Sequence, residues 1–155
     1  MPLTTLVRVK HIRLDKAERE ARVQLECLQR AEQAHHQSVE AVNDYRDWRL
    51  NEEALLYLRH QDSLVSRKLL EQWQRQVAVM REKETGLEQA VDEHRRTLQK
   101  QQAIVRQCQE QLKNAQQQAE KFNQLQQEAF ALQRLADETK EAAELDEFRY
   151  CTSET

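Results

Sequence analysis

The stretch that decides the fold is residues 70–122, LEQWQRQVAVMREKETGLEQAVDEHRRTLQKQQAIVRQCQEQLKNAQQQAEKF. Most residues at two positions of each seven are apolar or small. The first position is held by Leu70, Val77, Glu84, Val91, Leu98, Val105, Leu112 and Ala119, and the second by Trp73, Met80, Leu87, His94, Gln101, Cys108, Ala115 and Phe122. This spacing predicts a coiled-coil helix. So narrow an apolar stripe cannot form a core alone, so a second helix must cover it.

A weaker heptad pattern upstream supplies that second helix. It runs through Val7, Leu14, Ala21, Leu28, His35, Val42, Arg49 and Leu56, accompanied by Ala17, Gln24, Ala31, Ser38 and Tyr45. We predict one helix over about 4–57, a turn over about 58–66, a second helix over about 67–148 and a frayed tail at 149–155. Because so short a connection makes neighbouring helices antiparallel, the predicted fold is all-α. It is a single domain, an antiparallel coiled-coil hairpin of residues 1–155 whose longer second helix overhangs at its C-terminal end.

The register of the hairpin follows from where the turn is centred. A centre near residue 61 places Leu14 near Cys108 and Leu3 near Ala119, and leaves residues beyond about 120 without a partner. Polar seam residues are expected to fix which residues face each other, at some cost in stability. They are Gln24, Ser38, Arg49, Glu84 and Gln101.

Apolar residues continue beyond the predicted end of pairing, among them Phe122, Leu125, Phe130 and Leu132. Two interpretations stay open for this segment: a frayed, Gln-rich helix end in water, or a docking segment for another protein. Exposed phenylalanines on a lone helix favour docking.

The composition excludes several classes of protein. One Gly and one Pro in 155 residues cannot supply the tight turns of a β-rich or wound α/β fold. A net charge of −3 points to neither nucleic acid nor membrane, and no window is long and apolar enough for a membrane span. The N-terminus lacks the apolar region of a signal peptide. We expect a cytoplasmic protein, without a nucleic-acid partner and without direct membrane insertion.

The sequence also lacks the residues that catalysis needs. A phosphate-binding loop requires several glycines, and two helices side by side offer no shaped pocket for an activated nucleophile. The adjacent His35 and His36 point about 100° apart on a helix, so they cannot chelate one metal ion together. We expect no enzyme activity, no catalytic residues, no cofactor and no metal.

Aromatic residues gather near the predicted turn: Tyr45, Trp48, Tyr57 and Trp73. Trp73 is a seam residue expected to pack inside, whereas Trp48 lies off the strict seam and is expected to be partly exposed. The cluster is either a hydrophobic clasp that closes the hairpin or an interaction hot spot, since Trp, Tyr and Arg dominate interface energies.

Three runs of sequence resemble the YscO family of type III secretion proteins: RVKHIRLDKAERE at 8–20, DYRDWRLNEE at 44–53 and EQWQRQVAVMREKE at 71–84. Members of that family are similar to the flagellar export protein FliJ and, in shape, to the coiled coil of the rotary ATPase γ subunit. The resemblance implies a central stalk of the injectisome, a virulence-associated secretion machine. The resemblance also implies that this protein lies in the bacterial cytoplasm, at the periphery of the inner-membrane export apparatus.

The resemblance also implies partners and the residues that contact them. One end of such a stalk enters the hexameric secretion ATPase, here through Arg8, Lys10, Arg13, Phe122, Leu125 and Phe130. The other end reaches the cytoplasmic ring of the export-gate protein or, in some members, secretion chaperones, here through Tyr45, Trp48, Arg49, Trp73 and Met80. Two alternatives remain: an escort for unladen secretion chaperones, and a generic homodimeric scaffold whose long helices pair between chains.

Overall fold

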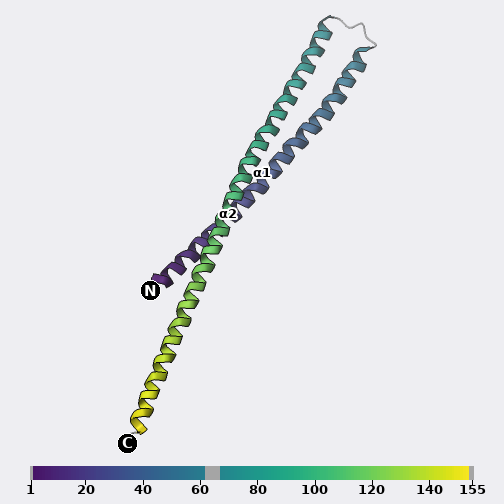
Figure 1. Ribbon diagram of the computed structural model, residues 1–155. Helices are drawn as coiled ribbons and strands as arrows, with labels where there is room; N and C mark the ends of the chain where they lie inside the picture. Colours follow the sequence, from purple (N-terminus) through teal and green to yellow (C-terminus); the bar gives the residue numbers. More distant parts are fainter. Residues whose placement is uncertain (1, 62–66, 154–155) are drawn as a thin grey trace. The chain divides into compact units, whose positions relative to one another are not determined.

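The computed structural model describes residues 2–61 and 67–153, and every one of these residues is helical (Figure 1). Helix α1 spans Pro2–Gln61 and helix α2 spans Arg67–Ser153. Residues 58–61 are therefore helical rather than part of a turn, and residues 149–153 continue α2 rather than forming a frayed tail. The rest of the predicted turn, 62–66, and the last two residues lie outside the described residues.

The helices extend further than predicted because nothing in the sequence ends them. Pro2 occupies the start of α1, where its fixed φ and missing N–H suit a helix. Neither Gly nor Pro occurs between Leu3 and Gln61, and Gly86 lies alone inside α2. Neither described helix has a segment sufficiently long and apolar to cross a membrane.

Both helices contribute to each of two compact units. Unit 1 contains Met1–Ala21 and Cys108–Thr155, and unit 2 contains Arg22–Gln107. In unit 2 the helices are antiparallel, because Gln24 of α1 contacts Gln101 of α2 whereas the later Arg46 contacts the earlier Glu84.

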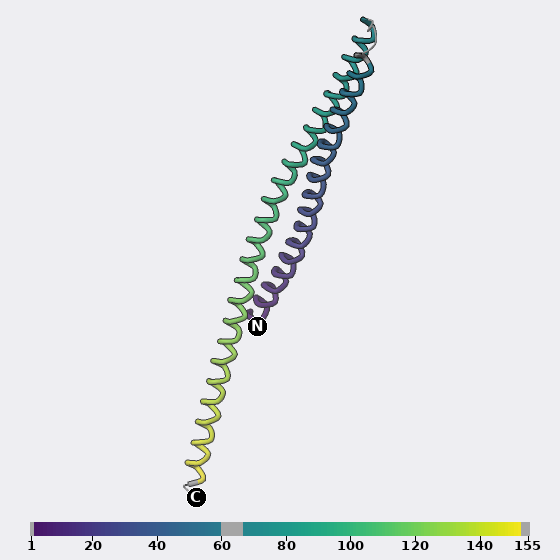
Figure 2. The backbone as a smooth tube through the Cα atoms, turned by 90° about the vertical axis from the view of Figure 1, so that its right-hand side faces the viewer, coloured from purple at the N-terminus to yellow at the C-terminus, as the bar shows by residue number. Residues whose placement is uncertain are grey.

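The helices of unit 1 are also antiparallel, but the predicted register is wrong. Leu3 lies with Gln126, Ala129 and Phe130 around one shallow apolar hollow, about one heptad beyond the predicted partner Ala119. The predicted centre of the turn, near residue 61, is too early, because α1 itself continues to Gln61. Pairing therefore extends past residue 120, and α2 continues beyond the start of α1 (Figure 2). Every residue from 132 to 152 is exposed.

The core of both units is thin. Unit 1 buries Val7, Ala21 and Ala119. Unit 2 buries Val42, Met80, Val105 and one charged residue, Glu84. Among the described residues no side chain is completely shielded from solvent. Two helices in contact can cover only one side of each other, so polar seam residues remain close to water.

We predict that Gly86→Ala stabilises the protein. An added Cβ at Gly86 meets no atom within 4 Å, and the glycine does not use a positive φ. Alanine should raise the free energy of unfolding by about 0.5–1 kcal/mol, since it restricts the unfolded chain and favours the helix. Thermal unfolding followed by circular dichroism checks this. The exposed Ala103→Gly is the matched control and should lower the stability by a similar amount; an unchanged or lower midpoint for Gly86→Ala contradicts the prediction.

Candidate functional site

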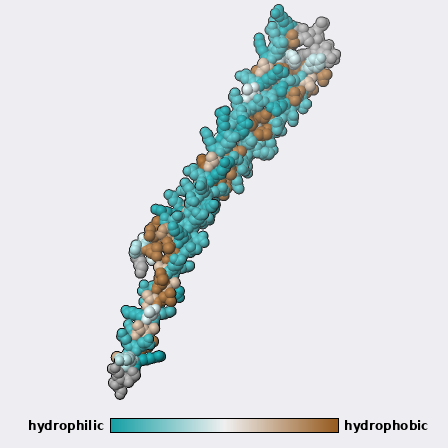
Figure 3. All heavy atoms as spheres, viewed as in Figure 1, coloured by the Kyte–Doolittle hydropathy of each residue, from teal (hydrophilic) through white to brown (hydrophobic). Residues whose placement is uncertain are grey.

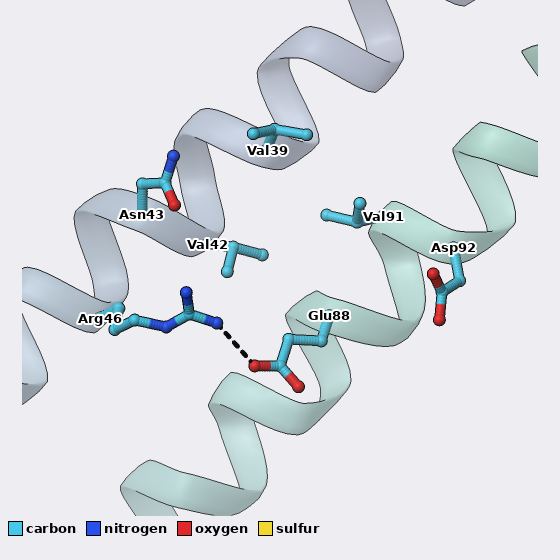
Figure 4. Close-up of a pocket in the computed structure, with 7 residues that line it drawn as sticks. All are labelled: Val39, Val42, Asn43, Arg46, Glu88, Val91 and Asp92. Atoms are coloured by element: carbon cyan, nitrogen blue, oxygen red, sulfur yellow. Dashed lines mark hydrogen bonds and ion pairs between the residues drawn. The ribbon is translucent and has the colours of Figure 1, made fainter.

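The described surface has several shallow hollows. One lies in unit 2 between α1 and α2 and is lined by seven residues: Val39, Val42, Asn43, Arg46, Glu88, Val91 and Asp92 (Figure 4). Its valines face each other across the helix pair, and its polar side chains lie at the rim. Within residues 2–61 and 67–153 no group of three His, Cys, Asp or Glu side chains is placed to hold a metal ion. The candidate sites are the surfaces that the sequence analysis predicts as contacts for other proteins.

A charge cluster joins the two helices of unit 2 around the buried Glu84. Arg46 donates from Nε to Glu84 Oε1 at 2.7 Å and from Nη2 to Glu88 Oε1 at 2.8 Å. Arg49 Nε lies 2.5 Å from the other oxygen of Glu84, and its Nη1 donates to Glu53 at 2.9 Å. The Arg49 and Glu84 side chains are only 14% and 11% exposed. The cluster therefore replaces apolar packing on the seam with paired charges.

The charge cluster shifts the pKa values of Glu84, Arg46 and Arg49 in the direction that favours ionisation. The hydrogen bond from Arg46 lowers the pKa of Glu84, and the charge of Arg49 adds to that effect against the opposing effect of burial. The hydrogen bond to Glu84 raises the pKa of Arg46. The hydrogen bond to Glu53 is the main cause that raises the pKa of Arg49. Glu84, Arg46 and Arg49 are thus charged near neutral pH.

A second polar contact crosses unit 2 at the seam residues Gln24 and Gln101. Gln101 Nε2 donates to the side-chain oxygen of Gln24 at 2.7 Å and to its backbone oxygen at 3.1 Å. Any slip of one helix along the other would separate both this pair and the arginines around Glu84. Polar residues predicted to fix the register therefore meet across the helix pair.

The five residues proposed from sequence for the gate or chaperone end divide into an exposed and an enclosed group. Tyr45 and Trp48 form a tilted aromatic pair with ring centroids 5.5 Å apart. Lys83 lies 5.1 Å from the Tyr45 ring. Trp48 is 50% exposed, as its position off the seam predicts. We call Tyr45, Trp48 and Lys83 together the aromatic surface.

The enclosed group consists of Arg49, Trp73 and Met80, whose side chains lie wholly or partly between the two helices. Arg49 belongs to the charge cluster, and Met80 is buried. Trp73 is partly exposed, but its indole N–H is shielded and finds no acceptor among the described residues. The role of these three side chains in binding stays a prediction.

The six residues proposed for the ATPase end all belong to unit 1, and two of them are in contact. Lys10 lies over the Phe122 ring, with its Nζ 5.2 Å from the centroid. Beside them His11 Nε2 is 3.1 Å from Asn123 Oδ1. Arg8 and Arg13 are exposed, as are Leu125 and Phe130, at 40% and 60%. Figure 3 shows hydrophobic surface near the start of α1 and farther along α2. Phe122 is thus part of the helix pair, whereas Phe130 lies at its edge.

Sequence reasoning missed the part played by Arg46 and Glu88. The available signal was Glu84 itself, because a carboxylate on an apolar seam requires a cation opposite it. Arg49 is the cation on the upstream seam. Placing Arg49 opposite Glu84 would have corrected the predicted register of the two helices and would have brought Arg46 next to Glu84.

We predict that Glu84→Gln destabilises the protein at neutral pH, and that its effect shrinks in acid. The folded pKa of Glu84 is lowered, so the stabilisation is complete above the unfolded value of about 4.3. It is lost as the pH falls through the folded value. Urea unfolding of the wild type and Glu84→Gln between neutral pH and about pH 3 measures the difference. The exposed Glu93→Gln is the control, and equal losses of stability at every pH would refute the prediction.

Comparisons with known proteins agree with this arrangement. The family model described as type III secretion protein YscO matches residues 3–150. The Yop proteins translocation protein O of Yersinia pseudotuberculosis serotype I (strain IP32953) is 35% identical over 120 residues, which are 77% of this chain and 78% of that protein. The crystal structure of type III secretion protein YscO from Vibrio parahaemolyticus is similar with a TM-score of 0.82 and 30% identity, over 94% of this chain and 92% of that chain. The chain therefore belongs to the YscO family of type III secretion proteins.

Proposed function

We propose that this protein is a non-catalytic stalk of the type III secretion machine. In this role unit 1 engages the hexameric secretion ATPase, and the aromatic surface of unit 2 engages the cytoplasmic ring of the export gate. The protein then works in the bacterial cytoplasm, at the periphery of the inner-membrane export apparatus. Membership of the YscO family supports the setting, and the two separate exposed surfaces support the division of contacts.

The observation that carries the ATPase contact is the exposed end of α2 in unit 1. Phe130 and Phe148 are 60% and 67% exposed. Eighteen residues are five helical turns, so the two rings lie on one side of α2. That side also carries Asp137, Glu141 and Glu144. Farther back along α2, the same side of the helix is the one that packs against α1. Large apolar side chains exposed on a single helix are typical of an interaction surface.

The mechanism would be allosteric rather than chemical. A body built from two helices has no sixfold symmetry, so its contacts with the six subunits of a ring must differ. Contacts that differ between subunits change their affinities for nucleotide by different amounts, which is a coupling free energy between the two sites. Repeated engagement would therefore bias hydrolysis around the ring without any catalytic residue in this chain.

We predict that Phe130→Ser combined with Phe148→Ser reduces stimulation of the cognate ATPase several-fold, because both anchors of the exposed side are lost. The rate of ATP hydrolysis at saturating nucleotide, with increasing amounts of each variant, measures this. The control is Tyr57→Ser, since Tyr57 is also 60% exposed but lies in unit 2. Full stimulation by the double variant would sink the assignment, whereas binding to empty chaperones without any effect on hydrolysis would favour the escort alternative.

We predict that Trp48→Ala weakens binding to the cytoplasmic domain of the export gate about tenfold or more, since a half-exposed Trp beside Tyr45 has the character of a hot spot. Arg49 is left intact because its replacement would also break the charge cluster. Binding is measured by calorimetry, and Tyr57→Ala is the matched exposed aromatic. Unchanged affinity of Trp48→Ala would remove the aromatic surface from this interface.

A further inference from the structure

The end of α1 and the start of α2 are the least buried parts of unit 2. We call residues 54–59 of α1 and 67–76 of α2 the tip segments. Only Leu56 and Trp73 among these residues are partly buried, and every other side chain of the two segments is exposed. Leu70 is a seam residue by its spacing, yet it is 44% exposed. Few buried apolar contacts are typical of a segment that opens while the rest of the protein stays folded.

Two further features weaken the tip segments. The indole N–H of Trp73 is shielded from solvent and finds no acceptor among the described residues, so the closed helix pair costs this group its hydrogen bond to water. The first turn of α2 carries Arg67 and Lys68 and no acidic side chain. Cations at the N-terminus of a helix oppose the helix dipole. The exposed ion pair between Arg67 and Glu71, at 3.8 Å, compensates for little of this.

The charge cluster limits how far the two helices can separate. Glu53 directly precedes the tip segment of α1, and its Oε1 lies 3.6 Å from Arg81 Nε of α2. Arg49 Nη1 donates to the same oxygen at 2.9 Å. Farther from the tip, the Glu84 side chain is only 11% exposed and pairs with Arg49. Separation beyond this point would leave a buried carboxylate without its cations, which is strongly unfavourable.

We propose that the tip segments open and close together as one unit while the rest of unit 2 stays paired, with the charge cluster as the boundary of the opening. In the open state both segments lose their helical hydrogen bonds, because most of the stability of a helix in a protein comes from packing. Trp73 then becomes accessible on all sides. Tyr45 and Trp48 keep their positions, because they lie on the side of the boundary that stays paired.

The opening controls which aromatic side chains a partner can reach. In the closed state the protein presents the aromatic surface and partly encloses Leu56 and Trp73. In the open state these two side chains are added to the accessible surface. A partner that binds the open state better than the closed state would shift the population toward it. The opening itself requires no partner and is therefore independent of the function proposed above.

Hydrogen exchange of the full chain, followed residue by residue by NMR, tests the opening. We expect the amides of residues 54–59 and 71–76 to share one level of protection and to exchange roughly tenfold or more faster than those of residues 38–46 and 84–92. The first four amides of α2 have no helical acceptor and are left out. Simple fraying would instead give protection that rises steadily with distance from each helix end. That result overturns the proposal, as does equal protection of all four segments.

A substitution in the charge cluster tests the boundary. Glu84→Gln should let the opening extend into residues 46–53, whose amides would then exchange as fast as those of the tip segments, because the arginines of α1 lose their charged partner. Glu93→Gln removes an exposed carboxylate of the same helix and should leave the boundary in place. A boundary that does not move in Glu84→Gln, in a chain that opens as described, overturns the role of the cluster and with it the proposal.

A change of charge at the start of α2 tests the cause of the opening. Arg67→Gln combined with Lys68→Gln should slow exchange in the tip segments several-fold, because two cations leave the N-terminus of the helix. Arg96→Gln combined with Lys100→Gln removes the same charge from exposed positions in the interior of α2 and should leave the tip segments unaffected. Equal effects of the two double variants overturn the proposal. Circular dichroism verifies that every variant keeps its helices.

Discussion

The pairing of Glu84 with Arg46 and Arg49 is the contact on which the arrangement of unit 2 depends. A carboxylate at a seam position loses hydration, and only cations held in place by the facing helix compensate for that loss. Apolar seam residues can exchange one neighbour for another at small cost, whereas Glu84 has one position in which both arginines reach it. That position determines which side chains reach the surface, since Tyr45 and Trp48 lie four residues and one residue before Arg49 on the same helix.

The sequence predicted the helices well because their signals are local. Heptad spacing over the two segments and the near absence of Gly and Pro require no knowledge of tertiary contacts. Register is different. Moving one helix by seven residues returns every seam position to a seam position, so the apolar pattern cannot distinguish Ala119 from Gln126 as the neighbour of Leu3. The linker carries no Gly or Pro to mark its centre. Only polar pairs such as Gln24 with Gln101 remove this ambiguity.

The candidate surfaces could be predicted in part, for the same reason. Trp48 lies off the seam, so its exposure follows from helical geometry alone. Arg49 and Met80 are seam residues that turn inward, although the family resemblance had implied that they contact a partner. A turn centred near residue 61 would place Phe122 at the end of the paired part of α2. Where each side chain points therefore depends on register, which is a property of both helices together.

The thin core has a consequence for how such a sequence can change. Because no described side chain is completely enclosed, stability is the sum of many small contributions rather than of a few large ones. A typical substitution on the seam leaves room for neighbours to adjust, and one on the outer faces meets only water. Selection then acts on the spacing of apolar residues and on a few paired charges, while most individual residues are free to vary. Divergent sequences can thereby keep the same pair of helices, and new binding partners can be acquired by changing exposed residues without rebuilding the fold.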